Sequence, residues 1–247
     1  MRIKLLNKLA RKRVFTIGEA VRITGLDRNT LKVLLSRLEK RGWVERIEKG
    51  KYIIIPLGAE KGEYTLHEFI IGSLLVKPSA IAYWSALNYH GFTEQIPSTV
   101  FVQTTARKKK QDLRIFGVRY KIIRIKPEKY FGVEKIWIEE FQVPITDREK
   151  TVIDCLDKPR YCGGIIEVAK AFREELEGEK LREYALRMNN SAVIRRLGYL
   201  CDYFGVNIDL PKPKTRNYIL FDPTMPREGN VEGKWKIIAN VELEGLE

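Results

Sequence analysis

The chain has 247 residues, of which 44% are hydrophobic and 31% charged, a composition typical of a folded protein with room for two modest domains and not of a disordered chain. Its 45 Lys and Arg against 32 Asp and Glu leave a net charge of +13, which favours a polyanionic partner. The longest apolar stretch, residues 69–76, is too short to cross a bilayer, and Arg2, Lys4 and Lys8 interrupt any export signal, so a cytoplasmic protein without membrane contact is expected.

The first pattern along the chain is a pair of short helices joined by a tight turn, within residues 16–41. Thr16 followed by Glu19 forms a capping-box sequence that predicts the start of the first helix. Gly25 ends this helix, and Asp27 is a suitable cap for a second helix over residues 28–41. Two helices at this spacing are typical of a helix-turn-helix.

The second helix has two different sides. Leucines 31, 34, 35 and 38 recur at helical spacing and predict the buried side. The rest of its surface carries small polar or basic groups suited to a DNA major groove: Arg28, Asn29, Thr30, Lys32, Val33, Ser36, Arg37 and Lys40. Asn29, Val33, Ser36 and Lys40 form the centre of this face.

Residues 43–48 and 51–55 read as two strands around a Lys49–Gly50 turn. Such a hairpin after a helix-turn-helix is a wing, and Arg46, Lys49 and Lys51 are expected to contact phosphates. The sequence therefore predicts a winged helix-turn-helix that binds DNA. The alternative is a winged helix that binds protein instead.

Positive charge is concentrated in two segments. The first fifty residues hold 14 Lys and Arg against 5 Asp and Glu, and residues 107–126 hold 9 against Asp112 alone. The second segment supplies a candidate second basic surface: Arg107, Lys108, Lys109, Lys110 and Arg114. A solvated charged face without a partner is the competing interpretation.

The remaining chain alternates between helix and strand patterns after a polar turn at residues 60–62. Helices are predicted over residues 64–76 and 79–90, the second capped by Ser79. Strand patterns rich in β-branched and aromatic residues follow at 98–105, 112–116, 118–125, 135–139 and 141–146. They are expected to form a mostly antiparallel sheet.

Helix patterns then dominate. Asp147 caps a helix to about residue 156, and further helices are expected over residues 165–176, 179–188 and 191–204. The last forty residues return to extended structure. The fold class is therefore α+β, with a winged helix at residues 1–60 and a larger domain at 61–247. This domain comprises a sheet region to about residue 146, a helical region to about 206 and returning strands.

The sequence offers little for catalysis or cofactor binding. Cys155, Cys162 and Cys201 form no C-x-x-C pair and are expected to be buried thiols, although a Cys155–Cys162 disulfide stays open because the composition resembles that of heat-adapted proteins. Asp147 and Glu149 beside Lys150 are compatible with a metal-dependent nuclease, but acids in a capped first helical turn are ordinary. We expect no enzyme, no catalytic residue, no metal site and no cofactor.

Three segments outside the winged helix resemble the AbiEi family of type IV toxin–antitoxin antitoxins, which double as transcriptional regulators. They are AIAYWSALNYHGFTEQIPSTVFVQT at residues 80–104, ITDREKTVIDCLDKPRYCGGIIEVAKAF at 145–172 and NYILFDPTMPREGNVEGKWKIIANV at 217–241. With the winged helix they span nearly the whole chain in the family's order.

This resemblance implies a repressor that binds inverted repeats in its own promoter, and a larger domain, residues 61–247, that neutralises a cognate nucleotidyltransferase toxin of an abortive-infection system. Direct contact with the toxin stays open, because antitoxins of this type are thought to act without a simple stoichiometric complex. Two alternatives remain. One is a winged-helix regulator whose larger domain senses a ligand or partner without any toxin, and the other is the DNA-targeted nuclease.

Overall fold

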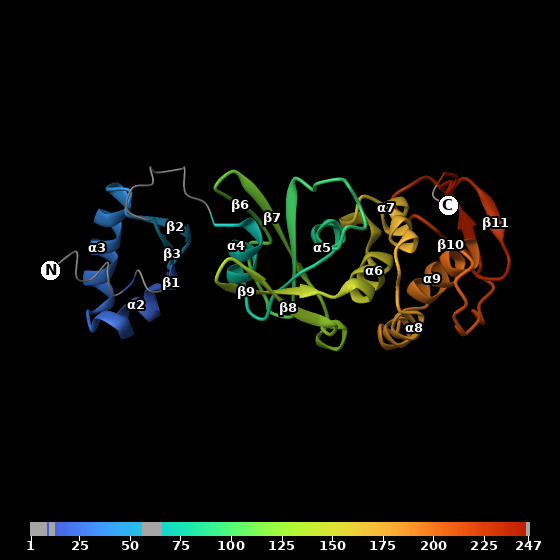
Figure 1. Ribbon diagram of the computed structural model, residues 1–247, viewed down its shortest axis with the longest axis horizontal. Helices are drawn as coiled ribbons and strands as arrows, with labels where there is room; N and C mark the ends of the chain where they lie inside the picture. The colour runs from blue at the N-terminus through green and yellow to red at the C-terminus, as the bar shows by residue number, and fades with distance from the viewer. Residues whose placement is uncertain (1–8, 10–12, 56–65, 246–247) are drawn as a thin grey trace. The chain divides into compact units, whose positions relative to one another are not determined.

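The computed structural model describes Leu9, residues 13–55 and residues 66–245. Contacts divide the chain into two compact units, Met1–Ile71 with Ile115–Gly117, and Gly72–Arg114 with Val118–Glu247. We call them the N-terminal and the C-terminal unit (Figure 1). The turn expected at residues 60–62 and the helix start expected at Tyr64 lie outside the described residues.

The N-terminal unit has the element order of a winged helix-turn-helix. Its elements are β1 (Val14–Thr16), α2 (Ile17–Thr24), α3 (Arg28–Lys40), β2 (Val44–Glu48) and β3 (Lys51–Ile54). The strands pair antiparallel in the order β1-β3-β2. Leu31, Leu35 and Leu38 of α3 pack with Phe15 and Ala20 in one core. The two predicted helices and the hairpin are confirmed.

A six-stranded sheet forms the framework of the C-terminal unit, in the order β6-β7-β5-β4-β9-β8. In chain order the strands are β4 (Ala80–Ile81), β5 (Thr99–Thr104), β6 (Asp112–Ile115), β7 (Val118–Arg124), β8 (Val133–Ile138) and β9 (Phe141–Thr146). The α+β class is confirmed, but the sheet is mixed, not mostly antiparallel. Pairs β4–β9 and β5–β7 are parallel, whereas β4–β5 and β8–β9 are antiparallel. Strand β7 runs parallel to β5 because β6 lies between them in the chain.

The predicted helix over residues 79–90 is wrong in its first half. Ala80 and Ile81 form β4 in the middle of the sheet, and the Ser79 hydroxyl donates to the Ser73 carbonyl at 2.7 Å and caps no helix. Helix α5 (Trp84–Tyr89) begins only after Tyr83, whose positive φ of 56° turns the chain out of the strand. A short apolar run that is buried on both faces has no periodicity to separate strand from helix.

The helices follow the sheet in chain order, except for α4, which precedes it. They are α4 (Glu68–Leu75), α6 (Arg148–Asp157), α7 (Ile165–Ala169), α8 (Gly178–Arg187) and α9 (Ser191–Tyr203), with 3-10 turns η1 (Pro127–Lys129), η2 (Pro159–Tyr161) and η3 (Lys170–Arg173). The predicted 165–176 helix is shorter than expected, because η3 replaces its second half. Asp147 caps α6 as expected, its side chain accepting from the Lys150 N–H at 2.8 Å. No helix among the described residues is long and apolar enough to cross a membrane.

A small sheet ends the chain, with β10 (Ile219–Leu220), β11 (Asn230–Glu232) and β12 (Ile237–Ala239) in the order β10-β12-β11. Two buried arginines of α9 hold it. Arg195 donates from Nε to the Trp235 carbonyl at 2.8 Å. Arg196 donates from Nη1 to the Leu156 carbonyl at 2.8 Å and from Nε to that of Phe221 at 3.0 Å. Backbone carbonyls thus satisfy these guanidinium groups, and they tie β10 and β12 to α9 and α6.

The closest packing in this region lies between α9 and Trp235. A Cβ atom placed on Gly198 would come within 2.4 Å of the Trp235 ring. The ring is 2% exposed, and its Nε1 donates to Asp202 at 2.6 Å. The indole is fixed by packing against α9 and by its hydrogen bond to Asp202, so it cannot move aside for a larger residue. Packing therefore requires glycine at residue 198.

We expect Gly198→Ala to lower the free energy of unfolding by about 1–3 kcal/mol through overpacking against Trp235. Urea unfolding followed by tryptophan fluorescence measures this loss. Gly233→Ala is the matched control, because a Cβ there has nothing within 4 Å. Equal stability of the two variants would contradict this account of the packing.

Candidate nucleic-acid interface

Side-chain caps fix both ends of the turn between α2 and α3. The Thr16 backbone N–H donates to Glu19 Oε2 at 2.8 Å, and the Glu19 N–H donates back to Thr16 Oγ1 at 3.2 Å. Gly25 closes α2 with a φ of 72°. Asp27 then accepts from the N–H groups of Asn29 and Thr30 at 2.9 and 3.0 Å. Hydrogen bonds from Thr30 hold the pKa of Asp27 below its usual value, so its charge stays at the positive end of α3.

Burial then fixes which side of α3 faces outward. Leu31 and Leu35 are fully buried and Leu38 is 1% exposed. All eight residues expected to face DNA from this helix are exposed: Arg28, Asn29, Thr30, Lys32, Val33, Ser36, Arg37 and Lys40. We call these eight residues the α3 face. It is a continuous polar and basic surface on a helix that is capped at its start and anchored along its back.

The wing presents its basic residues less evenly. Lys49 lies exposed in the turn before Gly50, whose φ is 81°. Arg46 is exposed too, beside a register shift between Arg46 and Glu48. Lys51, by contrast, is half-buried and lies 3.5 Å from a Glu48 carboxylate oxygen. Lys49 and Arg46 are therefore the better placed of the three for a polyanion.

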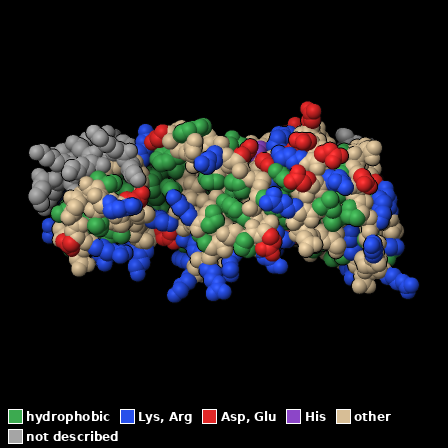
Figure 2. Space-filling view, turned by 90° about the horizontal axis from the view of Figure 1, so that it is seen from below, with side chains coloured by type: hydrophobic (Ala, Val, Ile, Leu, Met, Phe, Trp, Pro, Cys, Tyr) green, Lys and Arg blue, Asp and Glu red, His purple; other side chains and the backbone are tan. Residues whose placement is uncertain are grey.

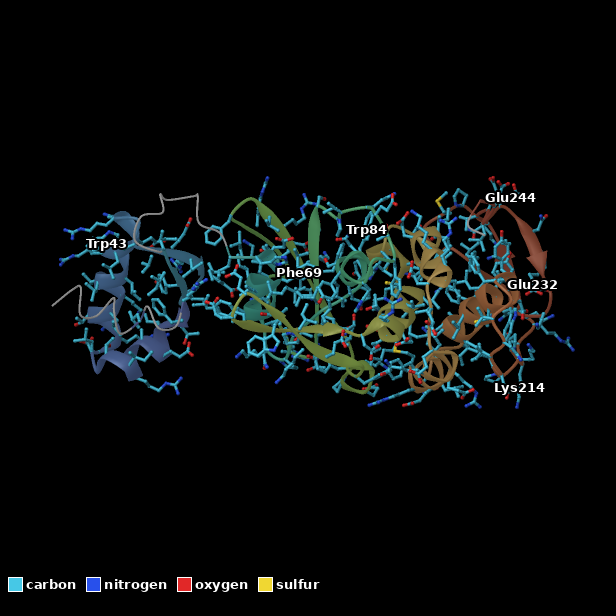
Figure 3. All side chains as sticks on the ribbon, viewed as in Figure 1. Trp43, Phe69, Trp84, Lys214, Glu232 and Glu244 are labelled. Carbon is cyan, nitrogen blue, oxygen red and sulfur yellow. The ribbon has the colours of Figure 1, made fainter. Side chains whose placement is uncertain are left out.

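One basic group near this surface was missed in the sequence. Arg41 follows α3 directly and is exposed, with its guanidinium carbon 5.8 Å from the centre of the ring of Trp43, the residue labelled in Figure 3. The ring restrains a cation at the C-terminal end of α3. The R-x-W spacing was the available signal.

The structure separates the residues of the second basic segment. Arg107, Lys109, Lys110 and Arg114 are exposed, but the Lys108 ammonium donates to the Leu75 carbonyl at 2.8 Å, at the end of α4. Figure 2 shows Lys and Arg side chains projecting from the sheet part of the C-terminal unit, whereas acidic side chains gather over its helical part. Charges on the edge strand β6 also disfavour pairing with another sheet edge. Lys108 is thus held by a local contact of its own.

The carboxylates considered for a nuclease are engaged by other side chains. Lys180 lies 2.8 Å from Glu149 Oε2 and 3.4 Å from Asp147 Oδ2, and the Tyr184 hydroxyl donates to Asp147 at 2.9 Å. The Lys150 side chain is fully buried. Within the described ranges no group of three His, Cys, Asp or Glu residues is arranged to hold a metal ion. These residues connect α6 to α8.

His90 and the three cysteines lie in the interior of the C-terminal unit or against its backbone. His90 Nε2 lies 2.7 Å from the Thr146 carbonyl oxygen, and burial lowers the pKa of the ring. Cys155, Cys162 and Cys201 are free and buried, as expected, and burial raises their thiol pKa values. High thiol pKa values make these groups weak nucleophiles.

Residues 4–55 match the model of a family described as "Transcriptional regulator, AbiEi antitoxin". The AbiEi resemblance is thereby confirmed for the N-terminal segment, which contains α2, α3 and the wing. The fold is similar to that of the RV2827C protein from Mycobacterium tuberculosis, with a TM-score of 0.65 and 14% identity over 95% of this chain and 89% of that one. Such identity shows a shared fold only. No curated protein matches the chain.

The contact between Glu149 of α6 and Lys180 of α8 makes the stability of the fold depend on pH. Although burial opposes it, hydrogen bonds from Lys180 and the Glu177 N–H lower the pKa of Glu149 below 4.5. A lowered carboxyl pKa stabilises the fold above pH 4.5, and this stability is lost as the pH falls through the folded value. The stability gap between wild type and Glu149→Gln should therefore be widest near neutral pH and close as the pH falls through the lowered pKa of Glu149 in the folded state.

Urea unfolding midpoints measured from pH 3 to 8 test this expectation. Glu179→Gln, which changes an exposed carboxylate of α8 beside Lys180, is the matched control and should follow the wild-type curve. A gap that stays constant through the acid range would show that Glu149 contributes packing and not charge.

Proposed function

We propose that this protein is a sequence-specific DNA-binding repressor of its own operon and the antitoxin of a type IV toxin–antitoxin system. The α3 face carries the first half of the proposal: eight exposed polar, basic or compact side chains on a capped helix. The match of residues 4–55 to a family of transcriptional regulators supports it.

In this proposal α3 lies in the major groove and its N-terminal half reads base edges. Asn29 is suited to adenine, because its side-chain NH₂ group can donate to adenine N7 while its amide oxygen accepts from the adenine N6 amino group. Lys49 and Arg46 of the wing neutralise phosphates and release counterions, as Arg41 does from the other end of α3. Inverted repeats in the promoter would present two such sites.

The antitoxin half concerns the C-terminal unit and a cognate nucleotidyltransferase toxin. It rests on the resemblance of residues 80–104, 145–172 and 217–241 to AbiEi antitoxins. These segments supply β4 and β5, the buried helix α6 and the final sheet, so the resemblance covers the framework of the unit. Direct contact with the toxin is left open.

Substitutions on α3 and in the wing should affect DNA binding in different ways. Asn29→Ala should relax sequence preference, at a cost of about 1–3 kcal/mol on the specific site, because base contacts carry the discrimination. Lys49→Gln should weaken specific and random duplexes alike and reduce the slope of log K against log salt by about 0.9. Fluorescence anisotropy with the protein's own upstream DNA and a scrambled duplex measures both.

Lys135→Gln removes an exposed lysine from β8 and serves as the charge-matched control. The same titrations decide the role of the second basic segment, since replacing Arg107, Lys109 and Lys110 together by Gln should make the salt slope shallower if they face DNA. Equal losses on both duplexes for Asn29→Ala would contradict a base-reading role. A salt-independent interaction would overturn the DNA-binding proposal.

The antitoxin half predicts a neighbouring reading frame for a nucleotidyltransferase. Inducing that frame alone should arrest growth, and co-expression of the full-length protein should restore it. Asn29→Ala should still restore growth when both genes are under foreign promoters, because neutralisation is assigned to the C-terminal unit. Growth arrest that the wild-type protein leaves unchanged would overturn this half alone.

A second candidate function is a regulator whose C-terminal unit senses a small polar ligand. A cleft of about 380 Å³ favours it, lined by Gly91, Phe92, Thr93, Glu94, Gln95, Lys170, Arg173 and Glu174. One wall is rigid, since buried Glu167 accepts from the Thr93 hydroxyl at 2.5 Å and from Lys170 at 2.6 Å. A chromosome without a neighbouring toxin frame would favour this candidate over the antitoxin.

A further inference from the structure

One side chain of the α3 face differs in chemistry from its neighbours. Val33 is 54% exposed, and in the described winged-helix residues 13–55 it is the large hydrophobic side chain left open to solvent. Lys32, Ser36 and Arg37 beside it are polar or charged. A single exposed valine is unremarkable on an ordinary surface, but this one lies at the centre of the face proposed to read DNA.

The position of Val33 on α3 sets what it can reach. Asn29 lies four residues before it and Arg37 four residues after it, so the three side chains follow one line along the helix. Four residues of helix advance about 6 Å, and successive bases of a DNA strand are about 3.4 Å apart. Val33 therefore reaches a base pair one or two steps from the pair that Asn29 reads.

The major groove offers one apolar group to such a side chain, the C5-methyl of thymine. Valine is suited to it because its branched side chain has one strongly preferred rotamer in a helix, which fixes its two methyl groups before binding. The buried Leu31 and Leu35 hold the backbone beneath it. The contact thus needs little ordering of the protein.

We propose that Val33 contacts the methyl group of a required thymine, one or two base pairs from the adenine read by Asn29. The inference rests on the proposed DNA-binding function and adds the identity of one base and the residue that selects it. Every half-site then contains one thymine whose methyl group, and not its hydrogen-bonding edge, is recognised.

The test replaces single thymines by uracil, which removes the methyl group and nothing else. Full-length protein first selects duplexes from a random pool, and each thymine of the selected site is then replaced in turn. For wild type, uracil at one position per half-site should weaken binding about fourfold, the value for one methyl group at roughly 0.8 kcal/mol. Val33→Ala should bind the thymine and uracil duplexes within twofold of each other.

Ser36→Ala is the matched control, because it changes a neighbouring exposed residue of the same face. It should keep the wild-type ratio between thymine and uracil even where overall affinity falls. A methyl group restored at the same position as 5-methylcytosine, compared with cytosine, should favour binding by wild type and not by Val33→Ala.

The outcomes separate this inference from the function beneath it. A selected site at which every uracil is tolerated would overturn the role of Val33 and leave DNA binding intact. A thymine preference that Val33→Ala retains would assign the methyl contact to another side chain and overturn it too. Failure to enrich any duplex would remove the proposed function itself.

Discussion

The C-terminal unit depends on an ion pair inside α6. The side chains of Lys150 and Asp154 are 0% and 2% exposed and bond to each other one helical turn apart, and the Lys150 ammonium lies 4.6 Å from the Phe131 ring centre. Removing one member of such a pair costs about 3–5 kcal/mol, because the other charge is left buried. Burial raises the pKa of Asp154, while Lys150 opposes that rise. Only one rotation of α6 about its axis keeps both charges buried and the Lys150 ammonium against the Phe131 ring.

From that fixed helix, hydrogen bonds extend to the surrounding elements. Thr151 and Thr146 share a hydroxyl contact of 2.7 Å that joins α6 to β9. Asp157 accepts from Lys129 at 2.9 Å and from Asn190 at 2.7 Å, and these bonds lower its pKa against the effect of burial. Lys150, Asp154 and Asp157 of the 145–172 segment thus point inward. In α3 the opposite holds, since its leucines face inward and its polar side chains are exposed.

Local chemistry was predictable from the sequence, and long-range pairing was not. The caps at Thr16, Asp27 and Asp147 involve residues two or three positions apart, so the sequence contains the whole interaction. The wing and the outward side of α3 follow from spacing in the same way. Strand β4 was missed because it is two residues long and the partners of Ile81, Val102 and Ile145, lie 21 and 64 residues further along the chain. The carbonyl contacts of Arg195 and Arg196 have no sequence signature at all.

Charge by itself overestimates the surface available to DNA. Of the basic residues singled out in the sequence, Lys51 lies beside Glu48 and Lys108 binds the end of α4, so each already serves its own unit. The remaining residues include those of the α3 face. The cap at the start of α3 and the buried leucines beneath it fix their positions before DNA binds. Discrimination between DNA sequences comes from a few base contacts made by side chains in fixed positions, whereas contacts to phosphates carry no sequence information. The α3 face is therefore a better guide to function than the net charge of +13.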